Sequence, residues 1–228
     1  MKDFEISDIK KLIDDFEPLP LNDPFLNGRY DWQRDVNGAE WPYYRFFYNL
    51  AAILRPQLTV ELGGYQGTAG AHFAAGHPDG AVITIDHHTD PGDEINKELM
   101  KDVVSWYSNV GYIQGWTVPQ VAVEQYGQHA LGNAPSAYET VRDIGLKIDI
   151  LFIDSWHVYE YAKMDWDAYR PLLNSPALVI CDDILDEDRV GFPISGMRRF
   201  WEELEGDKFL DDTLHPGSRM GFLRVGDE

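Results

Sequence analysis

Cysteine is nearly absent from this sequence of 228 residues, which contains only Cys181. A single cysteine excludes the intramolecular disulfide framework that holds many small secreted domains together. Long apolar runs are also missing, because stretches such as 148–153 and 177–181 are far shorter than the roughly 20 residues that cross a bilayer. Residues 1–11 are charged and have no apolar signal-peptide core, so we expect a cytoplasmic protein that does not span a membrane.

Positive charge is scarce as well. Lys and Arg number 19 against 39 Asp and Glu, which gives a net charge of −20. Binding to nucleic acid depends on Lys and Arg that displace counterions from phosphates, so we expect no nucleic-acid partner and no anionic membrane surface. A neutral or cationic small molecule, or an anion whose charge is masked by a metal ion, remains open. Hydrophobic residues make up 44% of the chain, which is enough for a substantial core.

The order of apolar patterns predicts a single α/β domain over 1–228. We expect strands at 58–62, 81–85, 112–115, 148–153, 177–181, 208–213 and 220–225, and helices at 3–16, 41–54, 68–75, 93–108, 118–124, 137–144, 159–173 and 196–205. Prolines indicate a loop from residue 18 to 37, inside an extension over 1–40 that could form a lid or a subunit contact. Strands separated by helices predict a mainly parallel sheet of seven strands with helices on both faces, and the last two strands predict an antiparallel hairpin.

Polar residues gather where the predicted strands end, which is where open α/β sheets bind their ligands. The first strand runs into a loop with Gly63, Gly64 and Gly67, and glycines allow a sharp turn and a close approach of a ligand. The spacing does not complete the dinucleotide fingerprint, so an ordinary strand-to-helix turn is an alternative. Glu61 within the strand end favours a cationic group over a phosphate.

Asp86 ends the second predicted strand, where a carboxylate can accept hydrogen bonds from both ribose hydroxyls of an adenosine cofactor. An exposed turn residue is the alternative interpretation. His87 and His88 follow directly and point in opposite directions in an extended segment, so they are poor partners for chelating one ion. We interpret both as residues at the edge of the cofactor or in solvent.

Two apolar strands deliver carboxylates at their carboxyl ends, Asp154 from one and Asp182 and Asp183 from the other. If the strands are neighbours, three like charges converge, and a cation would neutralise them. Oxygen ligands favour Mg²⁺ or another hard divalent cation. His157 would face the same pocket and could take a proton from a hydroxyl group. The alternative is that the aspartates and His157 cap neighbouring helices or pack in the wall.

Taken together, the glycine loop, Asp86, the Asp154-x-x-His157 segment and the Asp182-Asp183 pair resemble class I S-adenosylmethionine-dependent O-methyltransferases. The resemblance covers roughly residues 41–225 and is strongest to the metal-dependent branch of macrolide-sugar O-methyltransferases and cephalosporin-hydroxylase-like proteins. It implies a Rossmann-like methyltransferase fold and a cytoplasmic transferase acting on a small-molecule hydroxyl, such as that of a sugar or an aromatic natural product. Homo-oligomerisation and the role of 126–137 stay open.

The resemblance also assigns residues. It implies that the cofactor, S-adenosylmethionine, is bound by Glu61, Gly63, Gly64, Tyr65, Gly67, Asp86 and Trp116, that Asp154, Asp182 and Asp183 hold Mg²⁺ or another hard cation, and that His157 is the general base. Trp116 stands where relatives carry a small acidic residue. The alternatives are another enzyme on the same fold, such as a nicotinamide-dependent oxidoreductase or a metal-dependent hydroxylase or hydrolase, and a cofactor-binding module without turnover.

Overall fold

The computed structural model describes residues 1–19, 23–28, 42–88, 92–119, 136–185, 196–215 and 217–226. One sheet contains the strands β1 (Leu58–Leu62), β2 (Ala81–Asp86), β3 (Val110–Gln114), β4 (Ile148–Ile153), β5 (Leu173–Cys181), β6 (Asp207–Asp211) and β7 (Met220–Val225). Their order is β3-β2-β1-β4-β5-β7-β6. Only β7 runs against its neighbours, so the predicted parallel sheet with an antiparallel carboxyl-terminal hairpin is confirmed.

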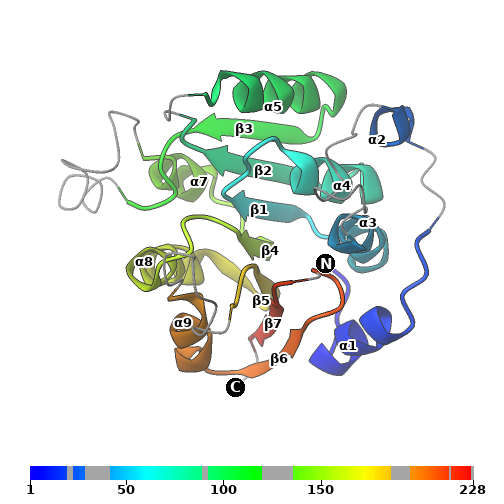
Figure 1. Ribbon diagram of the computed structural model, residues 1–228, viewed down its shortest axis with the longest axis vertical. Coiled ribbons are helices and arrows are strands. Elements are labelled where there is room, and N and C mark those ends of the chain that lie inside the picture. The colour runs from blue at the N-terminus through cyan, green and yellow to red at the C-terminus, as the bar shows by residue number, and fades with distance from the viewer. Residues whose placement is uncertain are drawn as a thin grey trace.

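The helices are α1 (Ile6–Asp14), α2 (Pro24–Gly28), α3 (Pro42–Leu54), α4 (Thr68–Gly76), α5 (Glu94–Trp106), α7 (Tyr138–Ile144), α8 (Tyr159–Tyr169, continued by the 3-10 turn Arg170–Leu172) and α9 (Met197–Glu203). They match the predicted ones within a few residues, except for α2, which was not predicted, and α8, which ends before Leu173 because that residue begins β5. In Figure 1, α7, α8 and α9 lie on one side of the sheet and α1, α3 and α4 on the other. None of the helices in the described ranges is long and apolar enough to cross a membrane.

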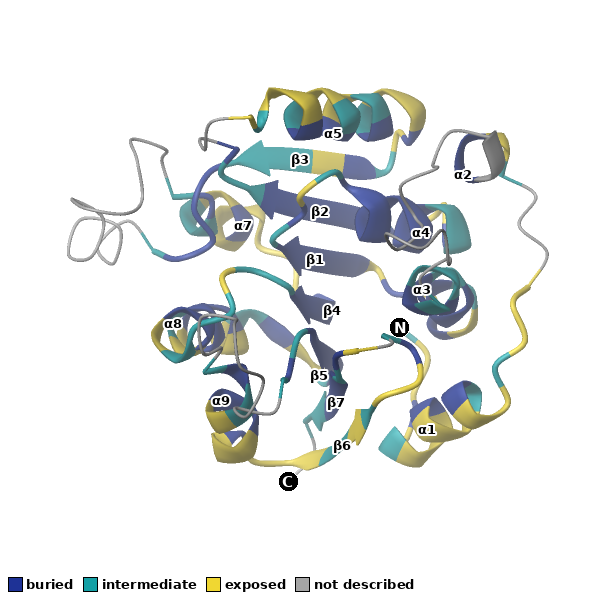
Figure 2. Ribbon diagram, viewed as in Figure 1, coloured by how far each residue is buried: buried dark blue, intermediate teal, exposed yellow. Residues whose placement is uncertain are grey.

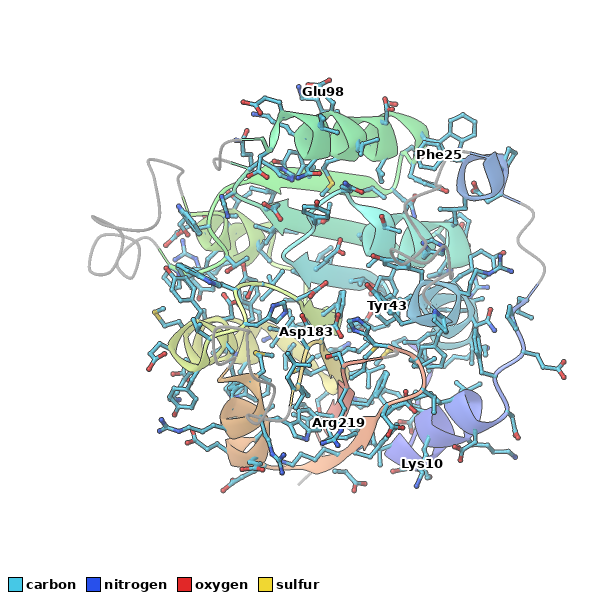
Figure 3. All side chains as sticks on the ribbon, in the orientation of Figure 1. Lys10, Phe25, Tyr43, Glu98, Asp183 and Arg219 are labelled. Carbon is cyan, nitrogen blue, oxygen red and sulfur yellow. The ribbon has the colours of Figure 1, made fainter. Side chains whose placement is uncertain are left out.

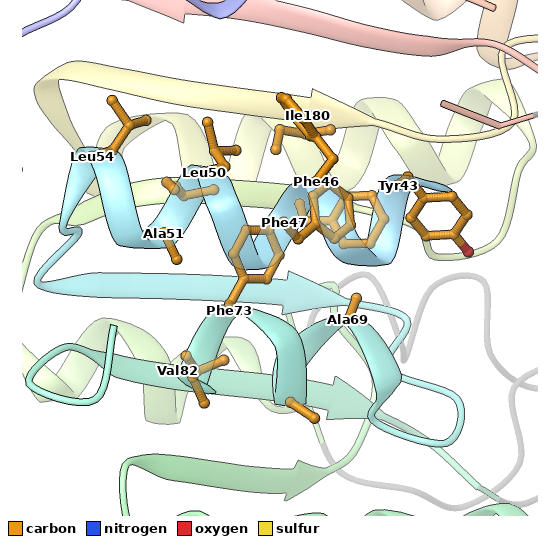
Figure 4. Packing of buried hydrophobic residues seen from close by; sticks show 14 of the residues in the cluster. Tyr43, Phe46, Phe47, Leu50, Ala51, Leu54, Ala69, Phe73, Val82 and Ile180 are labelled. Carbon is orange, nitrogen blue, oxygen red and sulfur yellow. The ribbon is translucent and has the colours of Figure 1, made fainter. Parts of the chain in front are cut away.

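Both faces of the sheet are buried, which explains why its central strands read as unbroken apolar runs. Every residue of β1 and of β4 is buried, and Figure 2 shows these strands in dark blue beneath helices whose outer sides are exposed. On the face covered by α3 and α4, Phe47 stacks on Phe73 with 4.5 Å between ring centroids (Figure 4). Phe47 also meets Phe152 of β4 edge-on. Aromatic packing therefore fixes these two helices against the strands that carry the site.

The carboxyl ends of the central strands are aligned. Leu62, the last residue of β1, pairs with Ile85 of β2 and Ile153 of β4, and Ile153 pairs with Cys181 of β5. The residues that come next therefore stand in a row across the sheet: Gly63, Asp86, Asp154 and Asp182. The strand order reverses between β1 and β4, which is the place where α/β sheets open a crevice for a ligand.

The prediction of a loop from residue 18 to 37 is wrong at Pro24–Gly28, because these residues form the short helix α2. Proline suits the first turn of a helix because its missing N–H would have no partner there. Asp23 accepts hydrogen bonds from the N–H groups of Phe25 and Leu26 at 2.8 and 3.0 Å, and so caps the helix.

Residues 20–22, 29–41 and 120–135 lie outside the described ranges. Most of the expected lid segment, of the expected helix at 118–124 and of the segment 126–137 falls on these residues.

Candidate active site

A cavity of about 580 Å³ opens beyond the carboxyl ends of β1, β2, β4 and β5. All the site residues predicted from the sequence line it except Gly67: Glu61, Gly63, Gly64, Tyr65, Asp86, Trp116, Asp154, His157, Asp182 and Asp183. The start of α3 closes another side with Tyr43 and Tyr44, neither of which the sequence assigned to the cofactor or the cation. Figure 3 labels Tyr43 and Asp183, two lining residues that are far apart in the sequence and lie near the middle of the molecule.

The glycine loop turns with the help of two glycines that have positive φ. Gly63 has φ +90°, and a Cβ there would lie 2.1 Å from the carbonyl oxygen of Asp154. Gly67 has φ +82° at the start of α4, where a Cβ would come within 2.8 Å of Met100 Sδ. Gly67 therefore shapes the turn against α5 and does not face the cavity, whereas Gly63 lets the loop pass directly over the end of β4.

Glu61 is a buried carboxyl at the floor of the cavity. Only 2% of it is exposed, and its Oε2 has no hydrogen-bond partner among the described residues. Burial raises the pKa of Glu61 to about 8, and the charges of Asp154 and Asp86 act in the same direction. A cationic group bound next to Glu61 would satisfy the orphan oxygen and stabilise its charged form.

Asp86 already holds the loop that it faces. Its Oδ2 accepts a hydrogen bond from the N–H of Tyr65 at 2.8 Å, and its Oδ1 accepts one from the N–H of His88 at 3.1 Å. A carboxylate can accept several hydrogen bonds, so Asp86 can still accept hydrogen bonds from the hydroxyl groups of a ligand. The alternative of a merely exposed turn residue does not fit, because Asp86 lines the cavity and organises its rim.

Trp116 forms a flat apolar wall beyond β3. Its indole is 7% exposed and stacks on His87, with ring centroids 4.2 Å apart and planes 18° apart. The indole Nε1 is buried without a hydrogen-bond partner in the described part of the chain. His87 thus lies at the edge of the cavity, as one of the two interpretations held, whereas His88 is buried and the solvent interpretation is wrong for it.

Asp154 and His157 face each other across the loop that follows β4. His157 Nε2 lies 3.2 Å from Asp154 Oδ1, and His157 Nδ1 lies 3.6 Å from Asp183 Oδ2. Burial lowers the pKa of His157, but the hydrogen bond to Asp154 and the surrounding carboxylates outweigh it and raise the pKa to about 9. Burial, followed by the charge of Asp182, raises the pKa of Asp154 to about 7.

Neither Asp154 nor His157 caps a helix. The N-cap position of α8 is Val158, and no side chain makes the capping hydrogen bond there. The capping alternative is therefore excluded for these two residues. Both belong to the loop that follows β4, and the parallel pairing of β4 with β5 places that loop beside Asp182 and Asp183.

A second cluster, which we call the acidic cluster, consists of Asp182, Asp183 and His215. Each offers one atom that could bind a metal ion, and these three atoms lie within 4.8 Å of one another. His215 Nδ1 is 2.8 Å from Asp182 Oδ1 and 3.9 Å from Asp183 Oδ1. Asp154 does not belong to this cluster, although the sequence places it among the metal ligands. His215 was missed because it belongs to the predicted turn between the last two strands, and only the pairing of β7 with β5 brings that turn over Asp182.

Backbone strain also concentrates around the cavity. Three non-glycine residues beside it have positive φ: Tyr65 at +45°, His88 at +44° and Asp183 at +53°. Such conformations persist only where the surrounding structure holds them, and they gather at functional sites.

Acidic groups outnumber basic groups in the cavity. Five carboxyl groups, from Glu61, Asp86, Asp154, Asp182 and Asp183, face it, and its described lining contains three histidines but no Lys or Arg. This excess of carboxyl groups favours ligands that carry positive charge.

A profile for the family described as a methyltransferase domain matches residues 60–184, which is more than half of the chain. The chain belongs to this methyltransferase-domain family. The matched stretch contains every site residue predicted from the sequence, whereas Tyr43, Tyr44 and His215 lie outside it. These three residues complete the cavity of this methyltransferase domain from elements that the family match does not reach.

Solved structures share the fold at low sequence identity. A putative caffeoyl-CoA O-methyltransferase from Staphylococcus aureus is 17% identical with a TM-score of 0.62, covering 96% of this chain and 100% of its own. The O-methyltransferase from Bacillus cereus in complex with SAH is 16% identical with a TM-score of 0.58, covering 96% of both chains. The O-methyltransferase TomG from Streptomyces achromogenes in complex with SAM is 16% identical with a TM-score of 0.57, covering 82% and 80%. No curated protein matches the chain.

Proposed function

We propose that this methyltransferase-domain protein is an S-adenosylmethionine-dependent O-methyltransferase that uses a divalent cation and acts on the hydroxyl of a small molecule. The observation that carries the proposal is the cavity at the strand-order reversal, with five carboxyl groups and no Lys or Arg in its described lining. S-adenosylmethionine bears a sulfonium and an ammonium group, which suit such a cavity. The SAM and SAH bound in the solved TomG and Bacillus cereus structures support the same cofactor.

The cofactor would extend along the row of strand ends. Glu61 would accept a hydrogen bond from the ammonium group of the methionine part, which would give its Oε2 a partner. Asp86 would accept the ribose hydroxyls, and Trp116 would pack against the adenine. The loop Gly63–Tyr65 would approach the cofactor with its backbone, because Gly63 and Gly64 let it pack closely over Asp154 and Thr84 at the strand ends.

The acidic cluster fits a divalent cation by its donors, which are two carboxylates and an imidazole. Oxygen donors suit Mg²⁺, and the imidazole extends the fit to Mn²⁺. The substrate hydroxyl would be acidified and held by such a cation. Asp154 stands beside the cluster and would add a further oxygen ligand or hold His157; the sequence favours the first role, and the 3.2 Å contact with His157 favours the second.

His157 is the proposed proton acceptor. The carboxylates around it raise its pKa to about 9, so with these charges alone it carries a proton at neutral pH. A cation and a sulfonium bound among the same carboxylates oppose that effect and favour the neutral imidazole, which can accept the proton of the hydroxyl. The remaining work of the protein is to align the hydroxyl oxygen with the methyl carbon.

The decisive experiment measures binding and transfer separately. Calorimetric titration with S-adenosylmethionine should show binding, and NAD⁺ should show none, since the described lining of the cavity offers no Lys or Arg to its phosphates. Mass spectrometry of a cell extract incubated with protein and methyl-labelled S-adenosylmethionine should then reveal an O-methylated product that disappears with a chelator and returns with Mn²⁺ or Mg²⁺.

Variants separate the cation from the cofactor. Asp182→Asn should abolish cation-dependent transfer and keep cofactor affinity within a few-fold, whereas Asp14→Asn on the exposed side of α1 should behave like the wild type. Transfer that persists in Asp182→Asn with chelator present would remove the cation from the mechanism. Binding of the cofactor without any labelled product would favour a cofactor-binding module instead.

A further inference from the structure

His88 is a buried histidine that touches two elements beside the glycine loop without lining the cavity. It is 6% exposed, and both of its ring nitrogens have partners. Nδ1 lies 2.6 Å from the hydroxyl of Tyr112 on β3, and Nε2 lies 2.5 Å from the carbonyl oxygen of Tyr65. The ring therefore bridges the edge strand β3 and the loop that follows β1.

The partners define which nitrogen carries hydrogen. A carbonyl oxygen can only accept, so Nε2 of His88 donates to Tyr65. In the neutral ring Nδ1 is then an acceptor, and the hydroxyl of Tyr112 donates to it. The other acceptor near that hydroxyl, the carbonyl oxygen of Asp86, is more distant at 3.4 Å. The chain of donors runs from Tyr112 through His88 to the backbone of Tyr65.

The peptide groups on both sides of Tyr65 are thereby held. Its N–H donates to Asp86 Oδ2 at 2.8 Å, and its C=O accepts from His88. Tyr65 has φ +45°, a conformation that a residue with a side chain rarely adopts without such contacts. His88 itself has φ +44°, which turns its ring back toward the loop.

We propose that His88 and Tyr112 form a clamp that holds the loop Gly63–Gly67 in the shape that binds the cofactor. The clamp residues are positioning residues, because neither lines the cavity: His88 touches the loop, and Tyr112 touches His88. This inference rests on the proposed binding of S-adenosylmethionine at that loop. A preorganised loop binds without first being ordered, so loss of the clamp weakens cofactor affinity. The acidic cluster lies on other loops and keeps its arrangement.

Three variants test the clamp through the dissociation constant of S-adenosylmethionine. His88→Phe keeps the ring and removes both nitrogens, so the constant should rise at least tenfold. His88→Gln places an N–H near the position of Nε2 and should stay within a few-fold of the wild type. Tyr112→Phe removes only the outer donor and should give an intermediate loss, and it provides a milder change if His88→Phe does not fold.

A matched control separates the clamp from general stability. The Nδ2 of Asn109, at the opposite end of β3, donates to the carbonyl oxygens of Ala74, His77 and Gly80. Asn109→Ala should lower the melting temperature and leave the affinity for S-adenosylmethionine unchanged. Hydrogen exchange of the amides from Tyr65 to Gly67 should accelerate in His88→Phe and not in Asn109→Ala.

The outcomes are distinguishable. Wild-type affinity in His88→Phe would overturn the clamp and leave the proposed function standing. An affinity loss in Asn109→Ala equal to that in His88→Phe, or no recovery in His88→Gln, would also overturn it, because the effect would then be general destabilisation. If the wild-type protein itself does not bind S-adenosylmethionine, the proposed function and the clamp both fail.

Discussion

The charged form of Glu61 is strongly disfavoured in the free protein, because the side chain is buried and lies near the carboxylates of Asp154 and Asp86. Its pKa is raised to about 8 by burial, so at neutral pH the free protein keeps Glu61 largely protonated. A ligand with a positive charge near Oε2 reverses that preference. Binding of such a ligand must therefore expel a proton, and this proton reports on Glu61 directly.

We predict that S-adenosylmethionine binding near pH 7 releases up to about one proton that the variant Glu61→Gln does not release. The measurement is calorimetric titration in buffers with different ionisation enthalpies. The same variant should weaken the affinity about tenfold or more, since it loses the charge that meets the ammonium group. Glu205→Gln, which changes an exposed residue, is the control. Equal proton release in wild type and Glu61→Gln would contradict the assignment of Glu61.

His72 on α4 gives a second prediction, which concerns stability. It is fully buried, stacks on Tyr44 with ring centroids 5.4 Å apart, and has no hydrogen-bond partner for Nε2 among the described residues. Burial lowers its pKa to about 4. Below about pH 6.5 the unfolded chain takes up a proton that the folded protein refuses, so the stability present above pH 6.5 is lost as the pH falls toward 4.

The variant His72→Phe keeps the ring contact and removes this titration. Between about pH 7 and about pH 5, the free energy of unfolding of the wild type should fall by about 2 kcal/mol more than that of the variant. Urea unfolding at the two pH values measures the difference. Parallel losses in the two proteins would show that His72 does not control the acid limb.

Single residues of the site divide into those that the sequence reveals and those that it does not. Asp154, Asp182 and Asp183 could be predicted to lie together because each follows a buried strand, and parallel strands end at one edge. His215, Tyr43 and Tyr44 could not, because nothing in their local sequence distinguishes them from turn or core residues. Their place in the cavity depends on the pairing of β7 with β5 and on the packing of α3. The burial of His88 depends likewise on Tyr112 of a neighbouring strand.

At the scale of elements, the strands were predictable for two reasons. The central strands are buried on both faces and therefore read as apolar runs, and glycine, proline or charged residues mark where these runs end. The helix α2 and the start of β5 were not predictable. The helix α2 depends on the cap from Asp23. The strand β5 begins at Leu173, which the sequence assigned to a helix, and it contains Pro176. Its pairing with β4 shifts register between Ile148 and Ile150. A proline predicts a break in a strand, but an irregular ladder can accommodate one.

The turn from β1 to α4 makes a prediction at this scale. In Gly63→Ala the new Cβ would meet the carbonyl oxygen of Asp154 at 2.1 Å, and the residue would keep a strained positive φ. We expect a loss of about 1–3 kcal/mol in unfolding free energy or more, together with weaker cofactor binding. Gly111→Ala in β3 is the matched control, because its Cβ has no neighbour nearer than 3.9 Å. Thermal unfolding and calorimetry compare the two, and wild-type behaviour of Gly63→Ala would contradict the crowded geometry.

At the scale of the whole molecule, the protein has a net charge of −20, and its cavity is also lined by acidic residues. Two electrostatic contributions to cation binding follow from this arrangement. Contacts with Asp182, which is 2% exposed, act at short range and are poorly screened by salt. Carboxylates on the outer surface act through solvent, where the Debye length is about 10 Å at 0.1 M salt, so added salt screens their contribution.

The two contributions can be separated by titrating Mn²⁺ at several salt concentrations. Between about 20 and about 300 mM KCl, the dissociation constant of Mn²⁺ for the wild type should rise several-fold, because the long-range attraction is screened. Asp182→Asn should weaken binding at least about tenfold at every salt concentration, since it removes a ligand. Asp14→Asn, on the exposed side of α1, should weaken binding slightly in low salt and not at all in high salt. If Asp182→Asn and Asp14→Asn had the same effect, the cation would be held by the general field of the protein and not by the acidic cluster.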